Sequence, residues 1–231
     1  MLKNATSDAN LKKSDRTRLH LMETALGAFR KHGYDACTMR ELAKMADVTA
    51  PAFYYYFKSK EEIIGEFYLE SLNTHLAEAE KLISEKDSLM VNLKKIILQR
   101  FEEFKGEREI LQVLKRVSFD KNNELSPFHP KHKKIRVASV DLFEALMNKS
   151  GMKWPAGSRR DMAQLLWMFH LLILFYWIED DSAGQKRSHE LVDRSLGHLS
   201  HFLFVFKIPG SQKVMSSILE TLKKARLLED L

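Results

Sequence analysis

The sequence predicts an all-α protein, and three observations support this prediction. Apolar residues recur at intervals of three and four along most of the chain, which is the spacing of one face of a helix. No stretch convincingly alternates apolar and polar residues, as a half-buried strand would. Glycine and proline number only 9 and 5 among 231 residues. They fall mostly between the apolar stripes, where they separate helices.

Seven apolar stripes are expected to form the long helices, at residues 19–29, 63–83, 89–104, 137–146, 163–178, 191–206 and 214–228. The first ends near Gly33. Ser59 and Glu62 fit a capping box that opens the second, whose apolar positions are Ile63, Phe67, Leu72, Leu76, Ala79 and Ile83. Ser126 and Pro127 are expected to open the fourth, with the serine as N-cap and the proline at the first helical position.

Residues 162–178 contain no acidic or basic side chain. As a helix they would reach ~26 Å, short of the ~30 Å hydrocarbon layer of a membrane, and Gln164 and His170 interrupt the run. A membrane span is therefore not expected, because a helix that is apolar all round is usually buried. Together with the apolar run at 196–206, this segment is predicted to form a subunit interface. The core of a single chain is the alternative.

The basic residues are concentrated at the N-terminal end. The net charge is +6, and residues 1–60 hold 11 Lys or Arg against 6 Asp or Glu, whereas the remainder is nearly balanced. This is typical of a polyanion-binding module attached to a neutral body, with a solvated basic face as the alternative. The one cysteine, Cys37, cannot form an internal disulfide, and residues 1–15 lack the apolar core of a signal peptide. A cytoplasmic location is expected.

Two short helices joined by a tight turn are predicted between residues 38 and 57. Thr38 and Glu41 fit a capping box that opens a helix over 39–46. A turn follows at 47–49, and Thr49 caps a second helix over 50–57 with Pro51 in its first turn. This is the helix-turn-helix plan, whose second helix enters the major groove of DNA.

The consecutive aromatic residues at 54–57 cannot all face one core, because successive helical residues point 100° apart. At least one tyrosine hydroxyl must therefore point outward, where it can donate a hydrogen bond to a phosphate. Tyr54 is the favoured candidate. Phe53 and Phe57 are expected to pack in the core.

Other side chains of this segment also suit DNA. Lys60 and the N-terminus of its helix offer a cation and free N–H groups to the phosphate backbone. Arg40 can bind a base edge with two hydrogen bonds, guanine being the usual target. Ala50, Pro51 and Ala52 can contact thymine methyl groups.

The pattern resembles the tetracycline-repressor (TetR) family of bacterial transcriptional regulators. The matching residues are Ala25, Phe29, Gly33-Tyr34, Thr38 to Ala43, Val48-Thr49, Phe53 to Phe57 and Ser59 to Glu61, without gaps over about fifty positions. The resemblance implies that Tyr54 and Lys60 hold phosphates. It also implies that Thr38, Arg40, Thr49, Ala50 and Tyr55 approach DNA. Two positions depart from the pattern: Asp47 stands where the family usually has glycine, and Tyr56 where histidine is frequent.

The resemblance also implies an organisation and a function. A flexible arm at 1–14 would precede a three-helix DNA-binding domain at 15–60, and a helical domain at 61–231 would make a homodimer and enclose an effector. Effector binding in this family shifts the helix that here begins near Ser59, and DNA affinity falls. The expected function is a ligand-responsive repressor that binds a palindromic operator as a homodimer.

A pocket would draw on large side chains of the C-terminal helices: Phe101, Phe104, Phe143, Trp167 and His170. Because charges are scarce there, an effector is expected to be apolar or aromatic. The alternative is that these residues fill the core, which aromatic residues at helical spacing usually do.

No catalytic constellation is evident. His129 with His132, and His198 with His201, lack a Cys or acidic partner at metal-ligand spacing. Residues 179–181, Glu-Asp-Asp, are expected to form a solvated acidic tip. Neither an enzyme nor a metal or cofactor is therefore expected. The alternative function is a helical interaction or membrane-surface protein that uses the basic run at 131–136 as an electrostatic anchor, although no membrane partner is expected.

Overall fold

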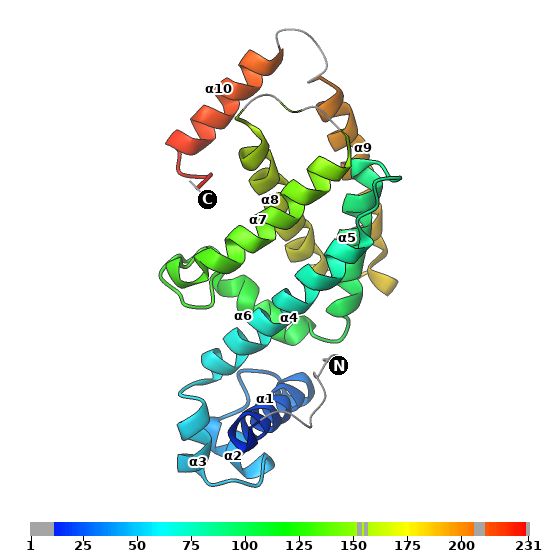
Figure 1. Cartoon of the computed structure of the whole chain (residues 1–231). Coiled ribbons are helices and arrows are strands. Elements are labelled where there is room, and N and C mark those ends of the chain that lie inside the picture. The colour runs from blue at the N-terminus through cyan, green and yellow to red at the C-terminus, as the bar shows by residue number, and fades with distance from the viewer. Residues whose placement is uncertain (1–11, 152–153, 155–156, 206–210, 230–231) are drawn as a thin grey trace. The chain divides into compact units, whose positions relative to one another are not determined.

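A computed structural model of the chain describes residues 12–151, 154, 157–205 and 211–229. This part contains ten α-helices and no strand, which confirms the all-α prediction (Figure 1). By their contacts, residues 12–74 and 104–132 form one compact unit, and residues 75–103 and 133–229 form a second. The functional limits expected at 14 and 60 stay predictions, and most of the predicted N-terminal arm lies outside the described residues.

The first unit contains α1 (Lys13–His32), α2 (Met39–Met45), α3 (Ala50–Tyr56), the first part of α4 (Lys60–Leu82), α6 (Arg108–Val117) and the 3-10 helix η2 (Pro130–His132). The second contains the remainder of α4, α5 (Leu89–Glu103), α7 (Lys133–Lys149), α8 (Arg159–Glu179), the 3-10 helix η3 (Ala183–Gln185), α9 (Lys186–Val205) and α10 (Ser211–Lys224).

The core of the first unit joins α1, α2 and α3. The buried face of α1 includes Leu21, Ala25 and Phe29, and α2 and α3 contribute Leu42 and Phe53, all fully buried. α1 contacts α2, and α2 contacts α3. α1 ends at Gly33, as predicted, since a φ of 83° there is readily adopted by glycine.

Side-chain caps begin α2 and α3 as the sequence predicts. The Thr38 hydroxyl accepts the Glu41 N–H at 3.3 Å, and the Glu41 carboxylate accepts the Thr38 N–H at 2.8 Å. The Thr49 hydroxyl accepts the Ala52 N–H at 3.3 Å. Each cap satisfies backbone donors that a helix leaves unpaired at its first turn.

The turn between α2 and α3 depends on Asp47. Its φ of 54° lies in the left-handed region, which aspartate tolerates better than most residues. The next residue, Val48, donates its N–H to the Ala43 carbonyl at 3.0 Å and so closes the end of α2. The position that departs from the family pattern therefore keeps the conformation that glycine would favour.

The sequence analysis missed α6. Its buried residues are Ile110, Leu111, Val113 and Leu114, a helical stripe that the periodicity contains. α6 packs against α1. At this contact Arg30 donates two hydrogen bonds, of 2.9 and 2.7 Å, to the buried carboxylate of Glu107.

The predicted start of the fourth stripe was wrong. Ser126 and Pro127 lie in turns, and α7 begins only at Lys133. The Ser126 hydroxyl instead donates to the Ser118 carbonyl at 2.6 Å and accepts the Phe128 N–H at 3.2 Å. The serine thus organises the loop rather than a helix terminus.

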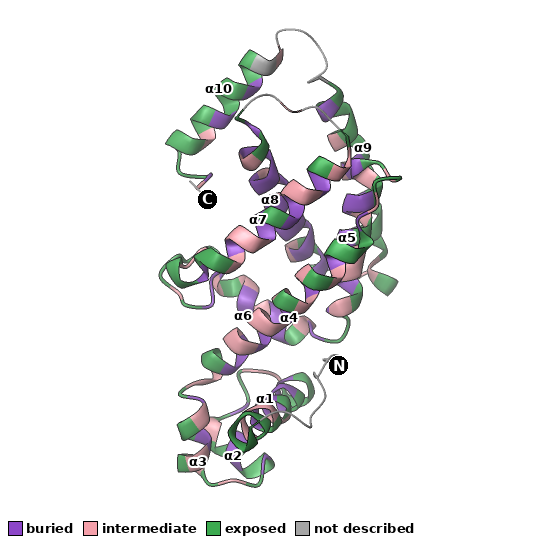
Figure 2. Cartoon of the chain, viewed as in Figure 1, coloured by how far each residue is buried: buried purple, intermediate pink, exposed green. Residues whose placement is uncertain are grey.

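α8 is the central helix of the second unit, where it contacts α5, α7 and α9. Length and composition would allow α8 to cross a membrane, but 67% of its most apolar window is buried inside the protein (Figure 2). Its burial is not complete on every side, because Leu172 and Tyr176 are 58% and 42% exposed. The helix α8 therefore packs in the core on most of its sides and exposes apolar side chains on the remaining side. Residue 206, the predicted end of the sixth stripe, lies outside the described residues.

The expectation of a solvated acidic tip at 179–181 was wrong for Asp180. Its carboxylate is buried and accepts hydrogen bonds from the N–H and hydroxyl groups of Ser182 and Ser188, at 2.7 to 3.0 Å. Burial alone would raise the pKa of Asp180, but these bonds hold it well below its usual range. Asp180 therefore joins the end of α8 to the start of α9.

Candidate nucleic-acid interface and effector site

The outer face of α3 is open to solvent. Pro51, Tyr54 and Tyr55 are exposed, the last two by 42% and 74%. Phe53 and Phe57 are fully buried on the opposite side, which confirms their predicted place in the core. Because residues four apart share a helix face, Pro51 and Tyr55 form one edge of this surface.

The remaining predicted DNA contacts lie at the starts of three helices. Thr38 and Arg40 are exposed at the start of α2, and Thr49 is exposed before α3, with Ala50 half-buried after it. Lys60 is half-buried at the start of α4, and its ammonium donates to the Tyr34 carbonyl at 2.7 Å. An ammonium carries three donors, so this bond leaves Lys60 able to donate to a phosphate.

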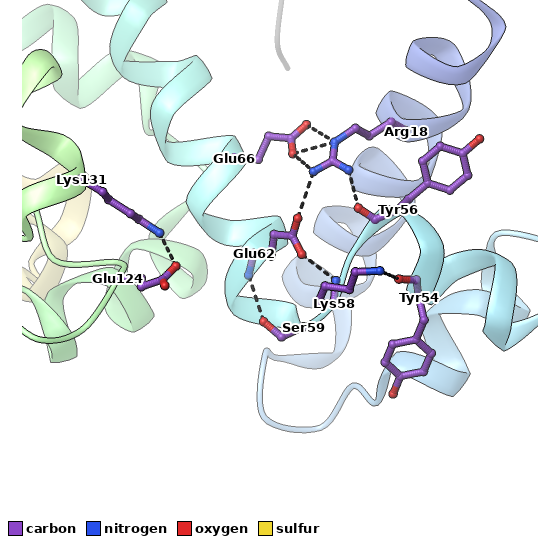
Figure 3. A network of polar contacts seen from close by, with 9 residues as sticks. All are labelled: Arg18, Tyr54, Tyr56, Lys58, Ser59, Glu62, Glu66, Glu124 and Lys131. Carbon is purple, nitrogen blue, oxygen red and sulfur yellow. Dashed lines mark hydrogen bonds and ion pairs between the residues drawn. The ribbon is translucent and has the colours of Figure 1, made fainter.

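Arg18 ties α1 to the end of α3 and the start of α4 (Figure 3). Its guanidinium bonds the Glu66 carboxylate at 2.9 and 3.0 Å, the Glu62 carboxylate at 3.3 Å and the Tyr56 carbonyl. It also lies over the Phe57 ring, 4.3 Å from the centroid. These contacts hold α3 and α4 in one arrangement, so a movement at the start of α4 would reach α3 directly.

One of the two hydrogen bonds of the predicted capping box at the start of α4 is present. The Ser59 hydroxyl accepts the Glu62 N–H at 3.2 Å. The Glu62 carboxylate, however, accepts the N–H of Lys58 at 2.6 Å and not that of Ser59 (Figure 3). The reciprocal bond shifts by one residue because Glu62 also faces Arg18.

Lys58 is a basic residue near the interface that the sequence analysis missed. It is exposed, and its ammonium donates to the Tyr54 carbonyl at 3.0 Å (Figure 3). This bond places a positive charge at the C-terminal end of α3, beside the predicted phosphate contact. Its position two residues before Lys60 is the signal that could have found it.

A hollow of about 770 Å³ lies beside the Arg18 network, between the first turns of α4 and residues 122–132. Its lining is both acidic and basic, and Lys131 pairs there with Glu124 as Arg18 does with Glu66 (Figure 3). Since these charges pair with one another, the hollow offers no strong net charge to a charged molecule.

The predicted effector residues are only partly brought together. In the second unit the rings of Phe143 and His170 lie 5.6 Å apart, and Trp167 is buried. Phe101 stacks instead on Trp177, with ring centroids 5.2 Å apart. Phe104 belongs to the first unit. The assignment of all five residues to an effector site stays a prediction.

A buried polar cluster surrounds His170, and the sequence analysis missed its other members. His75 of α4 is 1% exposed, and its ring stacks on His170 at 5.7 Å. The His75 Nδ1 lies 2.9 Å from the carboxylate of Glu103, which also bonds Arg100 at 3.0 Å. We refer to His75, Arg100, Glu103 and His170 as the histidine cluster.

Four of the six positions predicted for the stripe of α4 are buried: Ile63, Phe67, Ala79 and Ile83, the last directly after the helix. The predicted Leu72 and Leu76 are only half-buried, and Ser71 and His75 complete the buried face in their place. Both continue the i, i+4 spacing, which was a usable signal, but they are polar and so do not register as an apolar stripe.

The histidines of the cluster are neutral near pH 7. Burial and the nearby Arg100 guanidinium hold the pKa of His75 below its usual 6.5, against the opposing effect of Glu103. Burial, with His75 and Arg100 beside it, holds the pKa of His170 well below 6.5. A neutral His75 that faces a carboxylate through Nδ1 carries its proton on Nδ1.

Acidification is expected to destabilise the protein through these two histidines. Below pH 6.5 the unfolded chain binds protons at both, whereas the folded chain resists, so the free energy of unfolding falls as the pH falls. We expect a loss of at most about 1 kcal/mol per histidine between pH 6.5 and 5.5, with His170 the larger contributor, measured by urea unfolding. The free energy of unfolding of His75→Leu should depend less steeply on pH than that of the wild type. Equal slopes in the two proteins would contradict this expectation.

No group of three or more His, Cys, Asp or Glu residues that could hold a metal ion occurs in the described part of the chain.

Helix α3 is exposed on its outer face and anchored by the buried Phe53 and Phe57, and a second helical unit is present in the same chain. This arrangement is typical of helix-turn-helix regulators. Residues 21–67 match the family model described as bacterial regulatory proteins of the tetR family. Residues 92–223 match that of the tetracyclin repressor-like C-terminal domain. The chain belongs to the TetR family.

The similarity to individual relatives is limited in extent. The chain is 37% identical over 90 residues to the HTH-type transcriptional regulator TtgR of Pseudomonas putida. This stretch covers 38% of the chain and 42% of the length of that relative. Among solved structures, GusR of Salmonella enterica gives a TM-score of 0.62 at 18% identity, covering 84% of this chain and 98% of that one.

A second solved structure was determined with a ligand. FadR of Thermus thermophilus, a TetR-family transcriptional repressor in complex with lauroyl-CoA, gives a TM-score of 0.57 at 19% identity. The similarity covers 78% of this chain and 92% of that one. At these identities the two structures establish the shared fold.

Proposed function

We propose that the protein is a sequence-specific DNA-binding repressor that acts as a homodimer and releases a palindromic operator when an effector binds. The outer face of α3 is the observation that carries this proposal, because it presents Pro51, Tyr54 and Tyr55 while Phe53 is anchored beneath it. An exposed helix face of this kind fits the major groove. We propose the DNA contacts to be Thr38, Arg40, Thr49, Ala50, Pro51, Tyr54, Tyr55 and Lys60.

Exposed apolar side chains on α8 and α9 support the homodimer. Leu172 and Tyr176 of α8 lie four residues apart and are 58% and 42% exposed. Phe202 and Phe204 of α9 are 47% and 61% exposed. Apolar surface that recurs on two helices of one unit is typical of a subunit interface.

The second unit is the proposed effector domain. Its buried histidine cluster and the neighbouring Phe143 supply polar and aromatic groups inside one helical unit. A repressor of the same fold binds lauroyl-CoA, so an apolar effector suits this architecture. The relatives are transcriptional regulators, and we propose that this chain likewise has no catalytic activity and acts in the cytoplasm.

Part of the basic run at 131–136 is unavailable to a lipid surface. His132 and Arg136 are only 5% and 4% exposed, and Arg136 pairs with Glu229 at 2.8 Å. Lys131 is exposed but pairs with Glu124. Lys133 and Lys134 are also exposed, so the membrane-surface function stays the alternative that anionic vesicles test.

Selection of bound duplexes from a random pool tests the proposal. We expect a palindromic consensus with two half-sites separated by whole helical turns, and an affinity that falls steeply as salt rises. A pool without enrichment after repeated rounds, together with binding to anionic vesicles, would overturn the proposal in favour of the alternative.

Arg40→Ala is expected to relax the preference at one position of each half-site. Loss of a bidentate base contact costs about 1–3 kcal/mol in operator binding. Tyr54→Phe and Lys60→Ala should instead weaken binding to all sequences about equally, since phosphate contacts carry no base information. The same selection, run with each variant, measures the difference. An unchanged consensus for Arg40→Ala would refute direct base readout by this residue.

A further inference from the structure

The second unit contains buried hydrogen-bonding atoms without protein partners. His75 Nε2, His170 Nε2 and Gln99 Oε1 are inaccessible to solvent and make no hydrogen bond among the described residues. Buried polar atoms nearly always have a partner, because leaving one unpaired costs free energy. Gln99 is half-buried on α5, four residues before Glu103, so its side chain leaves the helix on the same side as the carboxylate that bonds His75.

At least two of these atoms require a donor. His75 carries its proton on Nδ1, which faces Glu103 at 2.9 Å, so its Nε2 is a lone-pair acceptor. Gln99 Oε1 is a carbonyl oxygen and accepts only. The missing partner must therefore supply an O–H or N–H group.

The charges of the cluster argue against an anionic partner. The Arg100 guanidinium, 2% exposed, bonds the Glu103 carboxylate at 3.0 Å, so its charge is already compensated. A carboxylate placed near His75 would also lie near Glu103, and like charges repel strongly where water is excluded. The surroundings are apolar: the Phe143 ring lies 5.6 Å from His170, and Leu146 and Leu171 are buried on the same helices.

We propose that His75 and Gln99 recognise the effector through a hydrogen bond that it donates, and that the effector is a neutral apolar or aromatic molecule with a hydroxyl or N–H group, such as a phenol. This inference rests on the proposed effector domain and adds the chemical class of its ligand. His75 binds the donor, Glu103 fixes the His75 tautomer as a positioning residue, and Phe143 with His170 provides an aromatic wall.

Matched pairs of phenols and their methyl ethers test the proposal by isothermal titration of the full-length protein. The pairs are 2-naphthol with 2-methoxynaphthalene and 4-phenylphenol with 4-methoxybiphenyl. We expect each phenol to bind about tenfold more tightly than its ether, since one satisfied buried acceptor is worth about that factor. We also expect 2-naphthoate to bind more weakly than 2-naphthol. Equal affinities within each pair, which a bound water at the cluster would produce, would overturn the proposal, as would phenols that fail to bind at 1 mM.

His75→Leu separates recognition from a structural role. We expect the phenol preference to disappear, because the acceptor is gone. The substitution also removes the 2.9 Å hydrogen bond between His75 Nδ1 and Glu103, so circular dichroism serves only to confirm that the variant is folded. His198→Leu, the same change at an exposed position of the second unit, should keep the preference. A folded His75→Leu protein that retains the preference would refute the assigned role.

The test of the effector class and the test of the repressor function can fail independently. Operator selection from the random pool reports DNA binding and does not depend on the naphthols. An enriched operator without a phenol preference would reject the effector class alone. A phenol preference without an enriched operator would reject the repressor function alone.

Discussion

Leu172→Glu is expected to convert the dimer into a monomer and to weaken binding to the full palindromic operator at least about 100-fold. The side chain is 58% exposed on α8, and a carboxylate there would have to be desolvated between two apolar surfaces. Two linked DNA-binding domains bind about 10²–10⁴-fold more tightly than one, because the second binding event becomes intramolecular. Sedimentation velocity and fluorescence anisotropy with labelled operator measure the two effects.

A control distinguishes loss of the interface from loss of folding. Val91→Glu introduces the same charge at a position of α5 that is 44% exposed, and it should leave both the dimer and the operator affinity unchanged. Leu172→Glu should still bind a duplex with a single half-site as weakly as the wild type does. A Leu172→Glu protein that sediments as a dimer would contradict the assignment of α8 to the interface.

Asp180→Ala is expected to lower the free energy of unfolding by about 3 kcal/mol, since it removes four hydrogen bonds to a buried carboxylate and leaves buried serine donors unpaired. Ser188 is fully buried, so water cannot replace the lost acceptor. Urea denaturation at pH 7 gives the change. Because the folded pKa lies below the ordinary 3.8, the carboxylate contributes its full stability above that pH and loses it as the pH falls further.

Asp181→Ala provides the matched control. Its side chain is 85% exposed, and its ion pair with Arg187 is also solvated, so its removal should cost less than about 1 kcal/mol. Similar losses of stability in the two variants would show that Asp180 is not the residue that joins α8 to α9.

The local chemistry of the N-terminal unit could be predicted from sequence. Thr38 and Thr49 begin α2 and α3 as their spacing predicts, and Phe53 and Phe57 are buried while Tyr54 and Tyr55 are exposed. These features depend on residues within four positions of one another, so the sequence carries the necessary information. The missed helix α6 was equally local, and its apolar stripe was simply not recognised.

The wrong predictions for Ser126 and Asp180 have a common origin in hydrogen bonds between residues that are not close neighbours in the sequence. Ser126 bonds a carbonyl eight residues away and organises a loop before α7, and Asp180 is buried by serines that follow it rather than exposed at a helix end. Hydrogen bonds of this range are invisible to periodicity, which scores a polar residue as a surface residue. The same rule left the buried His75 out of the stripe predicted for α4.

Residue order alone determined the all-α class, the capped helix-turn-helix and the membership of the TetR family, because helix periodicity, caps and motif spacing are properties of neighbouring residues. Only the tertiary structure decided that His75, Arg100, Glu103 and His170 meet inside the second unit. Burial turns these polar side chains from solvated groups into a set of neutral imidazoles and a compensated ion pair, and burial is set by the packing of whole helices against one another.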